Sequence, residues 1–261
     1  MNLTCEISLA EAYTSGSQRA RIVTEAWVAS NGYCLACDSD QLIATPRNTK
    51  ARDFECPQCN HPYELKSTRG SFGRQINDGA YSAMMGRIES SSTSSFLLLS
   101  YDPAWMVSSF QAVHHLFITP LTIQARKPLS DSAVRSGWTG CNILLDRIPK
   151  EGRIDLVRES IVMPKSASRK QFRQSEKLAC LSVSERTWTT IVLNLLHGLA
   201  ISTFTLADAY SFEDRLSKIY PYNRNIRPKI RQQLQVLRDL GFLKFLDRGI
   251  YKLEHNDISK G

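Results

Sequence analysis

The chain has 261 residues, of which 42% are hydrophobic and 22% are charged. This length accommodates one large domain or two smaller ones, and the composition is ordinary for a globular protein. The longest apolar stretches, residues 96–99 and 191–196, are too short to cross a bilayer, so we expect no membrane-spanning segment. No secretory signal is visible at the N-terminus, which favours a cytoplasmic protein.

Positive charge is concentrated in the last third of the chain. The formal net charge is +8, and residues 1–164 contain 16 Lys and Arg against 16 Asp and Glu. Residues 165–261 contain 17 basic and 9 acidic residues, so the whole excess lies there. A neutral part followed by a basic part indicates that the C-terminal part meets a polyanion such as nucleic acid. A basic surface that only aids solubility is the alternative.

The first predicted element is a helix over residues 17–30. Ser17 can cap it, apolar residues recur at helical spacing from Ile22 to Trp27, and Gly32 is placed to end it. Glu25 lies on this helix.

Two Cys-x-x-Cys pairs follow, separated by eighteen residues. This spacing is typical of a structural zinc site with four thiolate ligands, here Cys34, Cys37, Cys56 and Cys59. Two disulfides or a redox pair are the alternatives, but nothing nearby suggests a secreted scaffold or a thioredoxin-like unit. We expect the remaining cysteines to be reduced, as in a cytoplasmic protein: Cys5, Cys141 and Cys180.

Two carboxylates and a lysine are threaded through the cysteine pattern. Because side chains alternate along a strand, Glu64 and Lys66 should share one face while Leu65 points into the core. A zinc knuckle joining two strands could hold Asp53 beside them, and two carboxylates can bind Mg²⁺. Glu55 would share a strand face with Asp53, so spacing alone leaves it open as the metal ligand.

The segment after Lys66 alternates helix and strand and predicts a mixed α/β sheet. We expect a helix over 78–90, a buried strand over 96–101, a strand pair over 107–119 and further strands over 142–145 and 154–157. His114 and His115 are adjacent, would face opposite ways on a strand, and lack an evident third partner. Trp138 lies in a glycine-flanked polar loop, where it either packs or contacts DNA bases.

A basic, polar segment over 164–184 is predicted to be a partly helical linker, which places a domain boundary near residue 180. Domain one is therefore 1–180 and domain two 181–261. The second domain shows three apolar-periodic helices, over residues 188–196, 206–219 and 230–240, and then a hairpin over 242–253. This order is typical of a winged helix, a variant of the helix-turn-helix.

The third helix of that domain is the predicted DNA reader. Arginine suits guanine and glutamine suits adenine in the major groove, and a residue at the wing tip can reach phosphate. The predicted DNA-contacting residues are Trp138, Arg224, Arg227, Lys229, Arg231, Gln232, Gln233 and Arg248.

The acidic pattern resembles the D-x(n)-(E/D)-x-K core of the PD-(D/E)xK nucleases. The order CxxC, DFxCxxC, ELK and NDGAY, with GWTGCNI and IRQQLQVLRD further on, resembles the DpnI-like methyl-directed Type IIM restriction endonucleases over nearly the whole chain. The family's proline before the aspartate is absent, and Arg52 stands there.

This resemblance implies a PD-(D/E)xK nuclease domain and a winged helix acting on double-stranded DNA at GATC sites that carry N6-methyladenine. It favours Asp53 over Glu55 as metal ligand with Glu64 and the carbonyl of Leu65, and it makes Lys66 the residue that orients or deprotonates the attacking water. It also implies catalytic Mg²⁺ and structural Zn²⁺, and it raises Glu25 as an active-site neighbour. We expect a monomer.

Two rival hypotheses remain open at this stage. A non-catalytic regulator, built from a zinc ribbon and a winged helix, would account for the cysteines and the basic C-terminal part. A nuclease for other modified DNA or for damaged DNA is the third possibility.

Overall fold

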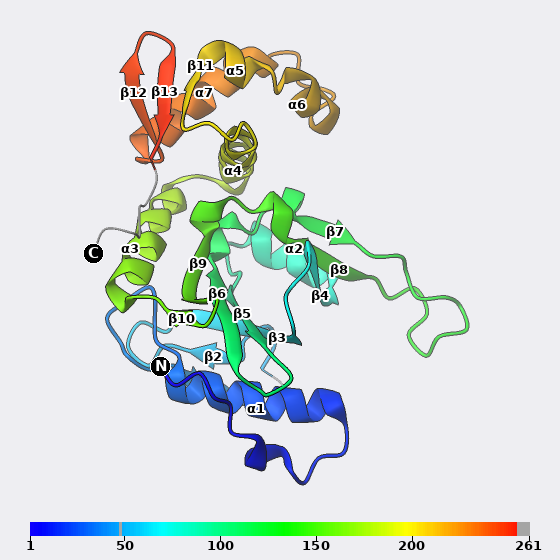
Figure 1. Cartoon of the computed structure of the whole chain (residues 1–261). Helices are drawn as coiled ribbons and strands as arrows, with labels where there is room; N and C mark the ends of the chain where they lie inside the picture. The colour runs from blue at the N-terminus through cyan, green and yellow to red at the C-terminus, as the bar shows by residue number, and fades with distance from the viewer. Residues whose placement is uncertain (47–48, 255–261) are drawn as a thin grey trace.

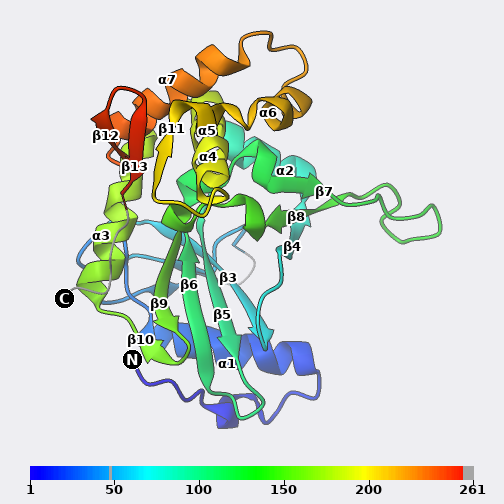
Figure 2. The same cartoon turned by 45° about the horizontal axis from the view of Figure 1, so that its top comes forward.

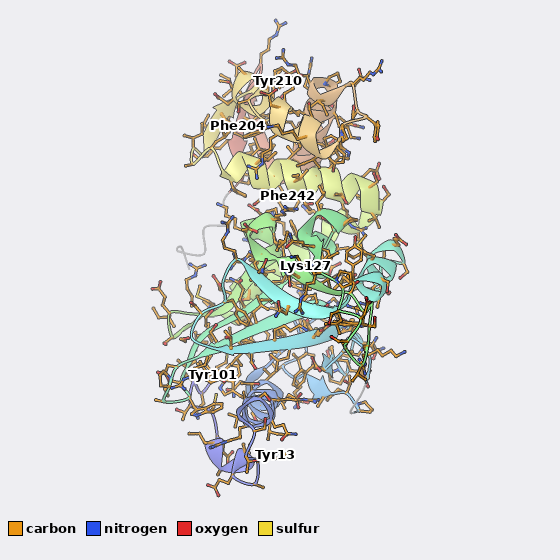
Figure 3. All side chains as sticks on the ribbon, turned by 90° about the vertical axis from the view of Figure 1, so that its right-hand side faces the viewer. Tyr13, Tyr101, Lys127, Phe204, Tyr210 and Phe242 are labelled. Carbon is orange, nitrogen blue, oxygen red and sulfur yellow. The ribbon has the colours of Figure 1, made fainter. Side chains whose placement is uncertain are left out.

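The structure is a computed structural model that describes residues 1–46 and 49–254. Helix α1 lies at one end of the molecule and the C-terminal helices and hairpin lie at the other, with a large sheet between them (Figure 1). Tyr13 and Tyr210 mark these two ends in the side view (Figure 3). The predicted mixed α/β fold with a C-terminal winged helix is confirmed.

The large sheet has seven strands in the order β1-β2-β3-β5-β6-β9-β10. Only β3 and β5 pair in parallel; the other neighbours are antiparallel. In that order the strands are Ile43–Ala44, Phe54–Glu55, Pro62–Arg69, Ser95–Tyr101, Val107–Val113, Arg153–Arg158 and Ile161–Val162.

Strand β5 is buried along its whole length because both faces of the sheet are covered. Leu97 and Leu99 pack on the side of α1 (Gly16–Asn31), in a cluster that includes Trp27. Phe96 and Leu98 pack on the opposite side, in a second cluster with residues of α2 (Tyr81–Glu89).

A second, three-stranded sheet lies beside the large one in the order β4-β8-β7. Its strands are Gln75–Ala80, Gly140–Leu144 and Ile123–Ala125. Residues 126–139, which we call the arm, join β7 to β8 and project away from the body of the molecule (Figures 1 and 2).

Two of the predicted secondary-structure elements are wrong in their bounds or type. Residues 78–80 belong to β4 rather than to a helix over 78–90, because they pair with β8, and α2 begins at Tyr81. The predicted strand pair over 107–119 is one strand, β6, followed by short 3₁₀ turns. The 3₁₀ helices are Ile7–Ala10, His115–Phe117, Pro120–Thr122, Leu145–Arg147, Lys150–Gly152 and Glu176–Cys180.

Helix α3 (Lys165–Ser175) connects the large sheet to the C-terminal part, and it buries Phe172 in the cluster on the side of α1. The winged helix follows with α4, α5, α6 and α7, and its sheet has the order β11-β13-β12. The helices are Val183–His197, Leu206–Tyr210, Glu213–Ile219 and Ile226–Asp239; the strands β11, β12 and β13 are Thr203–Thr205, Leu243–Asp247 and Ile250–Leu253. The predicted second helix is thus two short ones.

Within the part of the chain that the structure describes, no helix is both long and apolar enough to cross a membrane.

Gly152 lies just before β9 and packs closely against Phe117. A Cβ there would lie 2.5 Å from Cγ of Phe117, whose side chain is fully buried. We expect Gly152→Ala to lower the free energy of unfolding by about 1–3 kcal/mol, because overpacking forces the ring to move. Urea denaturation followed by circular dichroism measures this change.

The matched control is Gly86→Ala. Gly86 lies inside α2, and a Cβ there meets nothing within 4 Å. This change should leave the free energy of unfolding unaltered or raise it by up to about 1 kcal/mol, because alanine lowers the conformational entropy of the unfolded chain. A Gly152→Ala protein as stable as the wild type would contradict the packing described.

Candidate active site

The first part of the site is the start of β3, where a neighbouring strand brings Asp53 alongside. Phe54 pairs with Tyr63 in the antiparallel ladder, and the Asp53 amide donates to the carbonyl of Tyr63. The next step of the ladder puts Asp53 opposite Glu64. Asp53 lies just before the first residue of β2. Its carboxylate accepts a hydrogen bond from the Leu65 amide at 2.8 Å.

Strand β3 divides its side chains between the two faces of the sheet. Glu64 and Lys66 lie beside Phe96 and Leu98 of β5, on the face that carries the small sheet. Leu65 packs into the cluster on the side of α1. The alternation expected from the sequence is therefore present.

Lys66 lies between two carboxylates that come from different sheets. Its Nζ is 2.6 Å from Oε1 of Glu64 and 2.7 Å from Oδ1 of Asp78, on β4. Arg87 of α2 approaches the other oxygen of Asp78 at 3.6 Å. Asp78 was missed as a site residue because the local sequence predicts that it starts a helix; strand pairing with β8 turns it toward Lys66.

Burial and charge act in opposite directions on these groups. Burial raises the pKa of Glu64 to about 7, the nearby Lys66 ammonium opposes this, and the Asp78 charge adds to it. Burial lowers the pKa of Lys66, but the charges of Glu64 and Asp78 outweigh it and raise that pKa above its usual value. Lys66 is therefore an ammonium group here.

The oxygens around the start of β3 fit a divalent cation. Oε2 of Glu64 is buried and has no hydrogen-bond partner among the described residues. The N–H and C=O of one strand residue point to the same side, so the Leu65 carbonyl faces the side from which Asp53 approaches. Hard cations prefer such carboxylate and carbonyl oxygens. Glu55, by contrast, lies directly opposite Pro62 in the ladder and is paired with Arg52 at 3.0 Å.

Helix α1 contributes the neighbours of Asp53 on the other face. Arg21 is close enough for the Asp53 charge to raise its pKa, although its main partner is Glu25, at 2.6 Å. The Thr24 hydroxyl contacts that of Ser67 on β3 at 3.1 Å. Glu25 is thus held by an arginine on the same helix.

The four predicted zinc-ligating cysteines come together in one cluster. Their sulfur atoms all lie within 4.8 Å of one another, with Cys34 and Cys59 3.6 Å apart and Cys37 and Cys56 3.4 Å apart. A tetrahedral ion with sulfur ligands at about 2.3 Å requires sulfur separations of about 3.8 Å, close to these values. All four cysteines are free. The cluster could therefore hold a metal ion.

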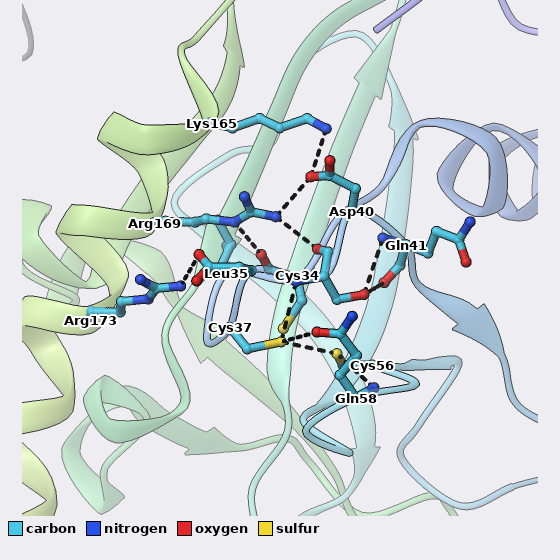
Figure 4. A network of polar contacts seen from close by, with 12 residues as sticks. Cys34, Leu35, Cys37, Asp40, Gln41, Cys56, Gln58, Lys165, Arg169 and Arg173 are labelled. Carbon is cyan, nitrogen blue, oxygen red and sulfur yellow. Dashed lines mark hydrogen bonds and ion pairs between the residues drawn. The ribbon is translucent and has the colours of Figure 1, made fainter.

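Helix α3 is fastened to the loop that carries the first cysteine pair (Figure 4). Arg169 donates to the carbonyls of Cys34 and Ser39 and pairs with Asp40, which also pairs with Lys165. The loop of the first cysteine pair therefore contacts the helix that leads to the winged helix.

His114 and His115 form a second group of possible ligands with Glu176. Burial lowers the pKa of His114 to about 3, so its ring is neutral. The Leu116 amide donates to Nδ1 of His114, which leaves the ring proton on Nε2, 3.3 Å from Glu176. A protonated Nε2 has no lone pair for a metal, so His114 does not offer this nitrogen as a ligand in this arrangement.

Trp138 lies at the base of the arm and is half-buried. Its ring covers Gly140, where a Cβ would come within 2.9 Å of the ring. The Trp138 carbonyl accepts from the Leu129 amide, which closes the arm. Figure 3 looks onto the arm, with Lys127 near the middle of the molecule.

The predicted DNA-contacting residues of the winged helix divide into exposed and buried ones. Arg224 precedes α7, which begins at Ile226, and Arg248 is exposed between β12 and β13. Gln233 is only 2% exposed, and its side chain accepts a hydrogen bond from Thr189 at 2.7 Å. The expectation that Gln233 faces DNA is corrected, since it joins α7 to α4.

The remaining predicted readers lie on the first turns of α7. Arg231 and Gln232 are exposed, and Lys229 donates to Gln232 at 2.9 Å. Arg227 pairs with Glu213 at 2.7 Å and lies over the ring of Tyr210.

Comparison with protein-family models gives two matches that together cover most of the chain. Residues 1–180 match the model of the DpnI family, described as the Dam-replacing family. Residues 184–253 match the model described as the Dam-replacing HTH domain.

Proposed function

The chain belongs to the Dam-replacing family, and from this premise we propose that it makes double-strand breaks in DNA at GATC sites carrying N6-methyladenine. Family membership supports a methylation-dependent restriction endonuclease of Type II. The proposal adds the Type IIM target and a reaction that depends on Mg²⁺. It divides the chain into a nuclease domain over 1–180 and a winged helix over 181–261, acting as a monomer.

The observation that carries the catalytic part is the convergence of Asp53, Glu64 and Lys66 at the start of β3. Asp53, Glu64 and the Leu65 carbonyl would hold Mg²⁺, which lowers the pKa of a bound water and offsets charge on the phosphate. Lys66 would orient or deprotonate the attacking water and stabilise negative charge on the phosphorane. A DNA-binding regulator would not require this arrangement.

DNA recognition is assigned to the exposed basic side chains of the winged helix and to the arm. Arg224, Arg227, Arg231 and Arg248 would contact bases or phosphates, with Lys229 and Gln232 beside them on α7. Trp138 offers an apolar ring at the base of the arm, two residues before β8 begins. A methyl group is apolar, so such a surface suits it.

We propose Zn²⁺ as the ion of the cysteine cluster. Four thiolates at tetrahedral spacing suit zinc, and such sites supply folding free energy. The cluster includes Cys56, close to Asp53 in the chain, and its first cysteine pair contacts α3 through Arg169, so we assign it a structural role.

The first test compares plasmids that differ only in adenine methylation. With Mg²⁺, we expect a plasmid from a host that methylates GATC adenines to be cut into fragments matching its GATC sites, and the unmethylated plasmid to stay intact. Cutting of both plasmids would contradict the methyl dependence. Binding of the methylated DNA without cutting would favour the regulator.

Asp53→Ala tests the metal ligand. The cleavage rate should fall at least about 100-fold, because metal stabilisation of the transition state is worth several kcal/mol. Binding of methylated duplex, measured by gel shift in Ca²⁺, should persist. Glu55→Ala is the control: it removes a carboxylate only two residues further along the chain, and cutting should survive. The reverse pattern would assign the metal to Glu55.

Metal analysis of freshly purified protein should find about one zinc per chain. Cys56→Ser should lose the metal and lower the melting temperature, because this cysteine lies between Asp53 and β3. Cys180→Ser is the control, since Cys180 is exposed and outside the cluster. Active protein without zinc would refute the assignment.

A further inference from the structure

We propose that Asp78 is a positioning residue that holds Lys66 in place for the reaction. The inference rests on the proposed nuclease function and adds to its site a residue that neither the nuclease sequence pattern nor the family comparison assigns. It is carried by the contacts, burial and strand connections of Asp78.

Asp78 is a buried anion in direct contact with the catalytic strand. Its side chain is only 3% exposed, and Oδ1 is 2.7 Å from Nζ of Lys66. Its second oxygen is buried, forms no hydrogen bond with the residues that the structure describes, and has Arg87 at 3.6 Å. A buried charge is costly unless it is paired, so the contact with Lys66 is a strong constraint on both side chains.

The two carboxylates around Lys66 would not remain equivalent during the reaction. A cation held by Glu64 would neutralise that carboxylate and repel the nearby ammonium. Of the ion pairs that the described residues form with Lys66, the one with Asp78 would then remain. Asp78 is thus the anion that holds the Lys66 side chain in position beside the attacking water.

Asp78 is itself fixed by a sheet other than the catalytic one. It pairs with Cys141 on β8, and the ladder is irregular immediately afterwards, between Asp78 and Ala80. The Tyr81 amide then donates to the carbonyl of Thr139, at the base of the arm. The position of Lys66 therefore depends on the sheet that carries the arm and Trp138.

Asp78→Asn removes the charge and keeps the shape. In single-turnover assays with saturating enzyme, Mg²⁺ and methylated duplex, we expect cleavage to slow about 10- to 100-fold, as is typical when a partner that orients a site residue is lost. The dissociation constant for the duplex in Ca²⁺, the melting temperature and the Mg²⁺ concentration for half-maximal rate should stay close to those of the wild type.

Asp146→Asn is the matched control. Asp146, like Asp78, is an aspartate in an ion pair. Its partner is Arg74, which lies just before β4, and the pair does not include a residue of the catalytic strand. Its loss should leave the cleavage rate unchanged. If Asp78→Asn fails to fold, Arg87→Gln replaces it, because Arg87 is the second cation beside Asp78; we expect slower cleavage at unchanged duplex affinity.

Three results would overturn the proposal. An unchanged cleavage rate in the variant used would show that Lys66 does not need Asp78. A rise in the Mg²⁺ requirement would make Asp78 a metal ligand, and weaker binding together with a lower melting temperature would make it structural. Because wild-type protein is assayed alongside, a wild type that cuts no DNA would refute the nuclease function itself and not only the role of Asp78.

Discussion

The ammonium group of Lys66, enclosed between two carboxylates, is the constraint on which the arrangement of this site depends. An amine at that depth is tolerated because Glu64 and Asp78 lie within 2.7 Å of it. Those carboxylates belong to different sheets, so the large sheet and the small sheet must meet at this point. The local geometry of β3 and the register of β4 are therefore tied to one another.

The cysteine cluster plays a comparable part on the other side of the catalytic strand. Its second pair lies in the connection between β2 and β3. It therefore fixes the turn that brings Glu64 of β3 back alongside Asp53. Its first pair receives Arg169 from α3, which leads into the winged helix. The cysteine cluster thus contacts both the segment next to the acidic site and the helix that leads to the C-terminal domain.

The winged helix uses its polar residues for two purposes. Gln233 faces inward and joins α7 to α4 through Thr189. Arg231 and Gln232, the residues just before it, are exposed. Helical spacing explains this division, since positions one residue apart point about 100° away from each other. A list of candidate readers drawn from composition alone therefore includes one member of the domain core.

Patterns of local origin were readable from the sequence: the two cysteine pairs, the alternation of Glu64, Leu65 and Lys66, and the apolar periods of the C-terminal helices. These depend on spacing along one segment, which the backbone geometry converts directly into a shared face. The strand assignment of Asp78, its contact with Lys66 and the inward turn of Gln233 were decided by tertiary structure. Each arises from pairing or packing between segments distant in sequence, where strand pairing overrides the helix expected from local composition.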